Sequence, residues 1–232
     1  MPIRDEFINV KCSPFILDIY VIRRAIFGAL MKYRHHYVGT LLDIGCGHMP
    51  YREILLAKPS RVSKYIGLDL VDNIYQKPDL EWNGQQIPLD DDSVDCALAT
   101  EVFEHCPEPE VVMREALRVL KTGGTLFFTV PFLWPLHCVP HDEYRYTPFS
   151  LERHLRAAGF SQIEIRALGG WEASLAQLIS LWALRRPMPR VLKAFVGVLA
   201  TPIVYLLNSC DRPPLTFGES CMITGLYGIA TK

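Results

Sequence analysis

From residue 40 onward, short runs rich in β-branched residues alternate with stretches of helical periodicity. This alternation limits the fold more than any other feature of the chain, because strands joined by helices pair in parallel and the helices cover both faces of the sheet. It predicts an α/β chain. Seven strands are expected, at residues 40–44, 64–69, 79–82, 94–99, 125–131, 162–168 and 222–230.

Two helices can be placed between these strands. Apolar residues at helical spacing predict a helix over 108–120, which Gly123-Gly124 is expected to stop. A second helix is expected between Thr147, a candidate N-cap, and Gly159, a candidate C-terminal stop.

Two apolar, basic segments lie outside this alternation. Residues 14–37 read as an amphipathic helix, and residues 171–208 read as a helical insertion before the last strand. We therefore expect an N-terminal helical extension over 1–38 and one domain over 39–232, with an insertion at about 171–210. The side chains expected to face inward from the first helix are Phe15, Ile16, Ile19, Ile22, Ile26 and Leu30.

Charge and cysteine content restrict the class of protein. Lys and Arg number 24 against 25 Asp and Glu, a formal charge of −1, so no basic field favours nucleic acid. The seven cysteines form no C-x-x-C pair, which argues against a disulfide scaffold and a zinc ribbon. The first residues, MPIRDEF, predict no secretory signal, and the apolar core at 194–207 is shorter than the roughly 20 residues of a spanning helix. We expect a cytoplasmic protein.

The segment LLDIGCGHMPY, at 41–51, is a strand that ends in Asp43 and continues through Gly45 and Gly47. The next strand delivers Asp69, where an acid commonly binds ribose hydroxyls. A dinucleotide fingerprint needs a third glycine where Pro50 stands, and a P-loop needs a Gly-Lys-Ser/Thr ending that is missing. The remaining interpretation is a cofactor with a ribose and a cationic amino-acid end but no phosphates.

These residues resemble the class I S-adenosylmethionine-dependent methyltransferases of the methyltransferase type 11 kind, over roughly residues 40–168 and the last strand. The resemblance implies a Rossmann-like, mostly parallel seven-stranded sheet whose last two strands form an antiparallel hairpin, and S-adenosylmethionine as the cofactor. Asp43 and the backbone of Gly45 and Gly47 would hold the methionine part, and Asp69 the ribose. In WNGQQIPLDDDSVD, Asn83 stands where the family usually has Asp. The full set of cofactor-binding residues implied is Asp43, Gly45, Cys46, Gly47, Asp69, Leu70, Asn83, Gly84 and Glu101.

The loop after the strand at 125–131 is rich in aromatic residues and histidine, and it leaves the sheet at the edge expected for the cofactor. Methyl transfer mainly needs an acceptor positioned close to the methyl group, and a base only when the acceptor is a hydroxyl or a protonated amine. His137, His141 and Asp142 are the catalytic candidates. We expect no metal; a divalent metal bound with Asp142 is the less favoured alternative, and structural hydrogen bonds are another.

Three residues that follow, Tyr144, Arg145 and Tyr146, are candidates for substrate binding. Arg145 would bind a carboxylate or a phosphate, or else pair with Asp142 or Glu143 within the loop. The segment resembles a branch of the family associated with bacterial cell-surface polysaccharide biosynthesis, which implies a small-molecule, sugar or lipid-linked glycan acceptor.

Several alternatives stay open. The two basic, apolar segments form either a lid or a peripheral contact with the inner face of a membrane. The rival functions are a nicotinamide-dependent oxidoreductase and a non-catalytic, membrane-associated adaptor that keeps the fold. Neither the acceptor, the methylated atom nor the oligomeric state follows from the sequence.

Overall fold

The computed structural model describes residues 6–232 and contains a seven-stranded sheet in the order β3-β2-β1-β4-β5-β7-β6. The start of the expected N-terminal extension, including Asp5, lies outside the described residues. The strands are β1 Val38–Ile44, β2 Arg61–Leu70, β3 Leu80–Trp82, β4 Val94–Thr100, β5 Leu120–Pro131, β6 Gln162–Ala167 and β7 Gly225–Thr231.

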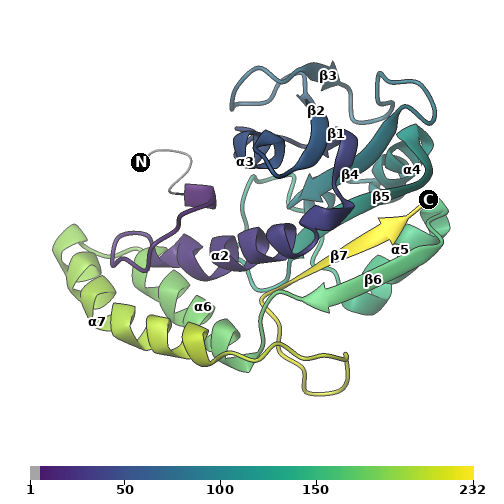
Figure 1. Cartoon of the computed structure of the whole chain (residues 1–232). Helices are drawn as coiled ribbons and strands as arrows, with labels where there is room; N and C mark the ends of the chain where they lie inside the picture. The colour runs from purple at the N-terminus through teal and green to yellow at the C-terminus, as the bar shows by residue number, and fades with distance from the viewer. Residues whose placement is uncertain (1–5) are drawn as a thin grey trace. The chain divides into compact units, whose positions relative to one another are not determined.

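Strands β3, β2, β1, β4 and β5 pair in parallel, and β7 and β6 are drawn with opposite directions (Figure 1). The expected Rossmann-like, mostly parallel sheet is confirmed. The central strands are buried on both faces, as the unbroken apolar run of β4 requires, with Cys96 to Ala99 fully inaccessible.

The helices are α2 Leu17–Lys32, α3 Arg52–Leu56, α4 Pro109–Val119, α5 Pro148–Ala158, α6 Trp171–Leu184 and α7 Arg190–Cys210, with 3₁₀ turns η1 Arg34–His36 and η2 Phe103–His105. Helix α5 begins and ends as expected, because the Thr147 side chain caps it and Gly159 takes a left-handed φ of 109°. Helix α4 differs: it ends at Val119, and Gly123 and Gly124 lie inside β5.

The chain divides into two compact units. Unit 2, residues 30–131, 135–165 and 227–232, contains β1 to β5 with α3, α4 and α5. Unit 1 consists of residues 1–29, 132–134 and 166–226 and contains α6, α7 and most of α2. The domain boundaries expected from the sequence stay a prediction.

Unit 1 has a core of its own. It consists of Val10, Leu17, Tyr20, Val21, Ala173, Ala176, Ala183, Ala200 and Val204. Phe15, which the periodicity places inward, precedes the first turn of α2 and is 74% exposed. Small residues at the contacts let α6 and α7 pack against each other (Figure 1).

Candidate functional site

Strand β1 delivers Asp43 to the carboxyl edge of the sheet, where its side chain is 1% exposed. Oδ2 accepts a hydrogen bond from the Tyr65 hydroxyl, whereas Oδ1 is buried and has no partner among the described residues. Burial, partly offset by the Tyr65 hydrogen bond, raises the pKa of Asp43 to about 7. A buried carboxylate oxygen without a partner suits a ligand that carries a cation or a donor.

Asp69 connects the end of β2 to the glycine turn, which lies 22 residues earlier in the chain at Gly47. Its Oδ2 accepts from the Gly47 amide at 2.8 Å, and its Oδ1 accepts from the Leu70 amide at 2.8 Å. Each carboxylate oxygen has two lone pairs, so both can accept a further hydrogen bond. Asp69 therefore holds the glycine turn and still has acceptor capacity for a ribose hydroxyl.

The glycine turn has left-handed backbone at Gly45 (φ 65°) and Gly47 (φ 50°). A Cβ atom on Gly45 would come within 2.7 Å of Val102, so only glycine fits there without strain. Cys46, between them, is buried, and its thiol points toward Gly67 rather than outward.

Residues of the loop after β2 close over this turn, and the sequence analysis did not identify them. Tyr75 contacts the His48 ring, with 4.9 Å between centroids, and Gln76 donates to the His48 carbonyl at 2.9 Å. Ile74 in the same loop is 88% exposed. The sequence signal that could have identified this loop is the set of apolar and aromatic residues shortly after Asp69, the acid at the end of β2.

Asn83 and Gly84 form a tight turn after β3. The Asn83 side-chain oxygen accepts from the amides of Gln85 and Gln86, and Gly84 takes a φ of 80°. The side-chain oxygen of Asn83, a residue expected to bind the cofactor, is thus used to shape the turn. A cavity of about 600 Å³ borders it, lined by Trp82, Asn83, Gln86, Ile87, Pro88, Leu89, Asp90 and Ser93.

Glu101 lies at the end of β4 with a left-handed φ of 56°. Its amide donates to the Thr129 carbonyl, and its Oε1 accepts from the buried Thr129 hydroxyl at 2.8 Å. These contacts tie the ends of β4 and β5 together and hold a strained backbone at the expected cofactor edge.

The loop at 135–146 is organised by Asp142, whose side chain is 1% exposed. Arg145 donates two hydrogen bonds to it, at 2.6 and 2.8 Å, and the guanidinium holds the pKa of Asp142 well below its usual range. The His137 amide also donates to Asp142, at 3.1 Å. Of the two roles left open for Arg145, the structure shows pairing with Asp142.

His137 and His141 occupy different surroundings. The His137 ring lies 3.3 Å from Asp142 and 4.7 Å from the His105 ring, and burial lowers the pKa of His137. His141 is exposed, and its backbone carbonyl lies 2.7 Å from Nδ1 of His105. The two predicted histidines therefore do not act as one side-chain pair.

Hydrogen bonds strap this loop to η2. The amides of Glu143 and Tyr144 donate to the Glu104 carbonyl, and the Tyr146 hydroxyl donates to the Phe103 carbonyl at 2.9 Å. Tyr146 is 2% exposed and stabilises the loop from within, and its role in substrate binding stays a prediction. Tyr144 stacks on it and reaches the Pro107 carbonyl at 3.1 Å.

Glu104 is a further residue that the sequence analysis passed over. Its side chain is fully buried, and neither carboxylate oxygen has a hydrogen-bond partner. Burial, with the nearby Glu101, raises the pKa of Glu104 well above its usual range. The only sequence signal was its place beside His105 in EVFEH.

The residues of this edge fit a ligand with a ribose and an ammonium group. Asp43 offers an unpartnered oxygen, Asp69 retains lone pairs, and Gly45 and Gly47 let backbone approach closely. Ligands of open α/β sheets bind at this edge, so fold and site together define a nucleoside-binding α/β domain.

Comparison with known proteins shows which proteins this edge and fold resemble. Residues 42–128 match the family model described as a methyltransferase domain. A S-adenosylmethionine-dependent methyltransferase structure from Archaeoglobus fulgidus superposes with a TM-score of 0.56 at 18% identity, covering 90% of this chain and 94% of that one. The chain thus resembles a methyltransferase domain over residues 42–128 and has the fold of that S-adenosylmethionine-dependent enzyme.

Two curated relatives are similar to part of the chain. One is a sarcosine/dimethylglycine N-methyltransferase from Halorhodospira halochloris, 34% identical over 34% of this chain and 32% of that protein. The other is the ubiquinone/menaquinone biosynthesis C-methyltransferase of Bartonella tribocorum, 28% identical over 44% of this chain and 50% of that protein. The chain thus spans a third to a half of the length of these relatives.

Proposed function

We propose that the protein transfers the methyl group of S-adenosylmethionine to a small-molecule acceptor held by the loop at 135–146. The observation that carries this is the pair of acids at the carboxyl ends of β1 and β2. Asp69 accepts a hydrogen bond from the Gly47 amide, and one buried oxygen of Asp43 accepts none from the described residues. When bound, the cofactor supplies a sulfonium-activated methyl group. The protein's part is to orient the acceptor for in-line attack and to exclude water.

Within this proposal the catalytic candidates Asp142 and His141 have different roles, and Asp142 orients the third candidate, His137. Asp142 is a positioning residue, because both its oxygens are held by Arg145 and it in turn orients His137. His141, with its exposed side chain, accepts the proton that a hydroxyl or ammonium acceptor loses. Methyl transfer then yields S-adenosylhomocysteine, the methylated acceptor and one proton held on His141.

For the acceptor we propose a sugar or a lipid-linked glycan intermediate. The support is the resemblance of the His137 to Tyr146 segment to polysaccharide-associated methyltransferases, together with the exposed apolar helix surface of unit 1. The two curated relatives methylate nitrogen and carbon respectively, so their names do not choose the atom.

The experiment has two parts. Calorimetry should show binding of S-adenosylhomocysteine and no binding of NADH; the reverse would overturn the proposed function in favour of an oxidoreductase. Labelled S-adenosylmethionine is then incubated with separate soluble and glycolipid fractions of the source cells. Label in a glycolipid supports the finer proposal, label only in a soluble product contradicts it, and cofactor binding without any labelled product favours the adaptor.

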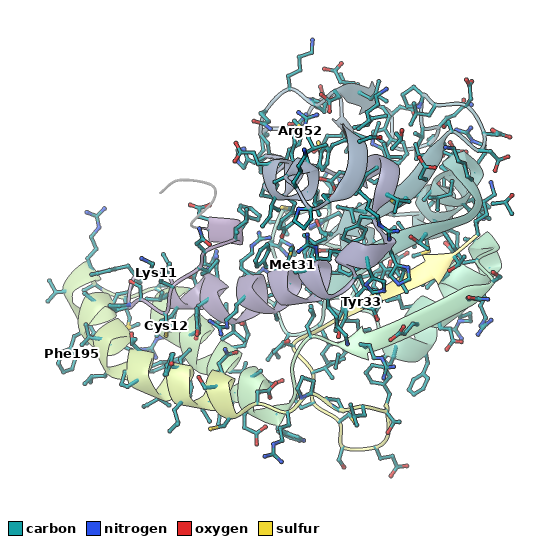
Figure 2. All side chains as sticks on the ribbon, in the orientation of Figure 1. Lys11, Cys12, Met31, Tyr33, Arg52 and Phe195 are labelled. Atoms are coloured by element: carbon teal, nitrogen blue, oxygen red, sulfur yellow. The ribbon has the colours of Figure 1, made fainter. Side chains whose placement is uncertain are left out.

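We also propose that unit 1 contacts the cytoplasmic face of a membrane. Among the described residues, α7 is long and apolar enough to cross a membrane, and only 17% of its most apolar window is buried. Phe195 lies at the outer edge of the helix (Figure 2) and is 60% exposed. The other large exposed apolar residues of α7 include Val191, Leu192, Val198, Leu199, Ile203 and Leu206.

The charged residues of the segment that carries this surface are basic. Arg186 and Arg190 are exposed beside it, and no acid lies between Glu172 and Asp211. An apolar stripe flanked by arginine suits the interface of an anionic bilayer. Pro202 lies inside α7, and we propose that the helix lies in the interface.

Vesicle flotation tests this contact. The protein should float with vesicles that contain phosphatidylglycerol and much less with phosphatidylcholine alone. The double variant Phe195→Ser/Leu199→Ser should lose most flotation, whereas Leu215→Ser, at an 84% exposed leucine outside α7, should not. Wild-type protein that stays at the bottom of both gradients would remove the proposal.

A further inference from the structure

One cluster of metal-ligating side chains remains outside the roles described so far. Within residues 6–232, His105, His137 and Cys138 place one ligand atom each within 4.8 Å of one another. His105 comes from η2, after β4, and the other two come from the loop after β5. Because β4 and β5 are parallel neighbours, both segments leave the sheet at the same edge.

The two histidines are oriented as metal ligands usually are. Nδ1 of His105 lies 2.7 Å from the His141 carbonyl, and Nδ1 of His137 lies 3.3 Å from the Asp142 carboxylate. A ligating histidine nearly always directs its second ring nitrogen to a carbonyl or carboxylate, which fixes its tautomer. Nε2 is then the nitrogen that each ring presents to a ligand.

A second, independent observation is the Glu104 carboxylate. Its side chain is completely buried, its Oε1 lies 3.7 Å from Nε2 of His105, and neither oxygen accepts a hydrogen bond from residues 6–232. A buried carboxyl that makes no hydrogen bond is costly unless something outside the described chain satisfies it. A cation beside His105 would do so.

We propose that His105, His137 and Cys138, with Glu104 as the fourth ligand, form a binding site for a divalent transition metal of the zinc type. Two imidazoles and a thiol select zinc or cobalt over magnesium and calcium, which prefer oxygen ligands. Donor atoms around tetrahedral zinc lie roughly 3.5 Å apart, given Zn–N near 2.0 Å and Zn–S near 2.3 Å. Side-chain rotations close the remaining gap from 4.8 Å.

This site differs from the sequence expectation, which was no metal or a metal bound with Asp142. Asp142 is occupied by Arg145, and only the backbone carbonyl of His141 reaches the cluster. With a metal on Nε2, His137 is a ligand and does not act as a base. The metal site is independent of the proposed methyl transfer, because it requires neither cofactor nor acceptor.

Cobalt titration tests the site. Full-length protein, stripped with a chelator and exchanged into metal-free buffer, should bind one equivalent of Co²⁺ and develop a near-ultraviolet thiolate-to-cobalt charge-transfer band. Zn²⁺ should abolish the band. In competition with a chromophoric chelator, Cys138→Ser should bind Zn²⁺ at least tenfold more weakly and show no charge-transfer band with Co²⁺.

Matched variants separate a built site from surface binding. Cys221→Ser, at another exposed free cysteine, and His141→Gln, which keeps its carbonyl, should bind like wild type. Glu104→Gln and His105→Gln should weaken binding at least tenfold. Because Cys138 is exposed, we expect Cys138→Ser to fold, and its metal affinity can be measured even if Glu104→Gln, at a buried residue, prevents folding.

The proposal is overturned if wild-type protein binds no Co²⁺, if cobalt binds without the charge-transfer band, or if Cys138→Ser and Cys221→Ser bind equally. S-adenosylhomocysteine affinity, measured on the same metal-free samples, reports the proposed function separately. A negative result for metal binding therefore does not affect the interpretation of cofactor binding, and the reverse also holds.

Discussion

At the scale of single residues, two acids at neighbouring strand ends have different electrostatic surroundings. Asp69 accepts two backbone amide hydrogen bonds, whereas Asp43 accepts only the Tyr65 hydroxyl and is more deeply buried. Burial, only partly offset by the Tyr65 hydrogen bond, disfavours the charged form of Asp43. Substitution of each acid should therefore have a different effect.

Replacing Asp69 by alanine should weaken S-adenosylhomocysteine binding by about 1–3 kcal/mol, roughly 5- to 150-fold. The change removes the ribose acceptor and also leaves the Gly47 amide without its partner. Titration calorimetry measures the affinity, and Asp72→Ala, an exposed acid in the following loop, is the control. Equal affinities for wild type and Asp69→Ala would place the ribose elsewhere.

Asp43 should make the unliganded protein less stable as pH rises. Its pKa is raised from 3.8 to about 7, so the contribution is complete below pH 4 and is lost as pH rises through 7. The difference between these two pKa values corresponds to a contribution of roughly 4 kcal/mol at most to the free energy of unfolding. Urea unfolding between pH 5 and 8 should show a smaller decline with pH for Asp43→Asn than for wild type; parallel curves would contradict the shifted pKa.

At the scale of elements, local signals located α5 correctly and missed the end of α4. The Thr147 cap and Gly159 act within one turn of α5, so the sequence contains the whole signal. Helix α4 stops at Val119 because Leu120 already pairs with Val94 of β4, a contact that no local pattern records. Pairing of Leu120 with β4 therefore fixes an extended backbone where the helix would otherwise continue.

Thr147→Ala should lower the free energy of unfolding by about 1 kcal/mol, since it removes the hydroxyl that accepts from the Ser150 amide, while the backbone amide of residue 147 still donates to the Ser150 hydroxyl. Thr147→Ser keeps the hydroxyl and should restore nearly all of that stability. Denaturant unfolding of the three proteins measures the effect. Indistinguishable midpoints for wild type and Thr147→Ala would show that the capping box contributes nothing.

At the scale of the whole molecule, each of the two units has its own buried side chains, and all the proposed cofactor-binding residues belong to unit 2. The core of unit 1 is made chiefly of small residues of α6 and α7 with larger ones from α2 and the N-terminal segment. Stability of unit 1 and affinity for the cofactor should thus be separable.

Leu17, fully buried in the unit 1 core, tests this separation. Leu17→Ala should cost about 2–5 kcal/mol of stability through the cavity it creates, while S-adenosylhomocysteine affinity below the unfolding transition changes less than twofold. Phe15→Ala, at a 74% exposed neighbour, should change neither quantity. Scanning calorimetry and titration calorimetry supply the two readouts, and a large loss of affinity in folded Leu17→Ala would contradict the separation.

The sequence by itself determined the α/β alternation, the strand-end acids Asp43 and Asp69 and the glycine turn, because these depend on residues close together in the chain. Only the tertiary structure decided the state of groups that meet across long separations. It buries Tyr146 against Phe103, and it brings His105 to His137 and Cys138. Burial and proximity across strands depend on the path of the whole chain, and periodicity within one segment contains no record of them.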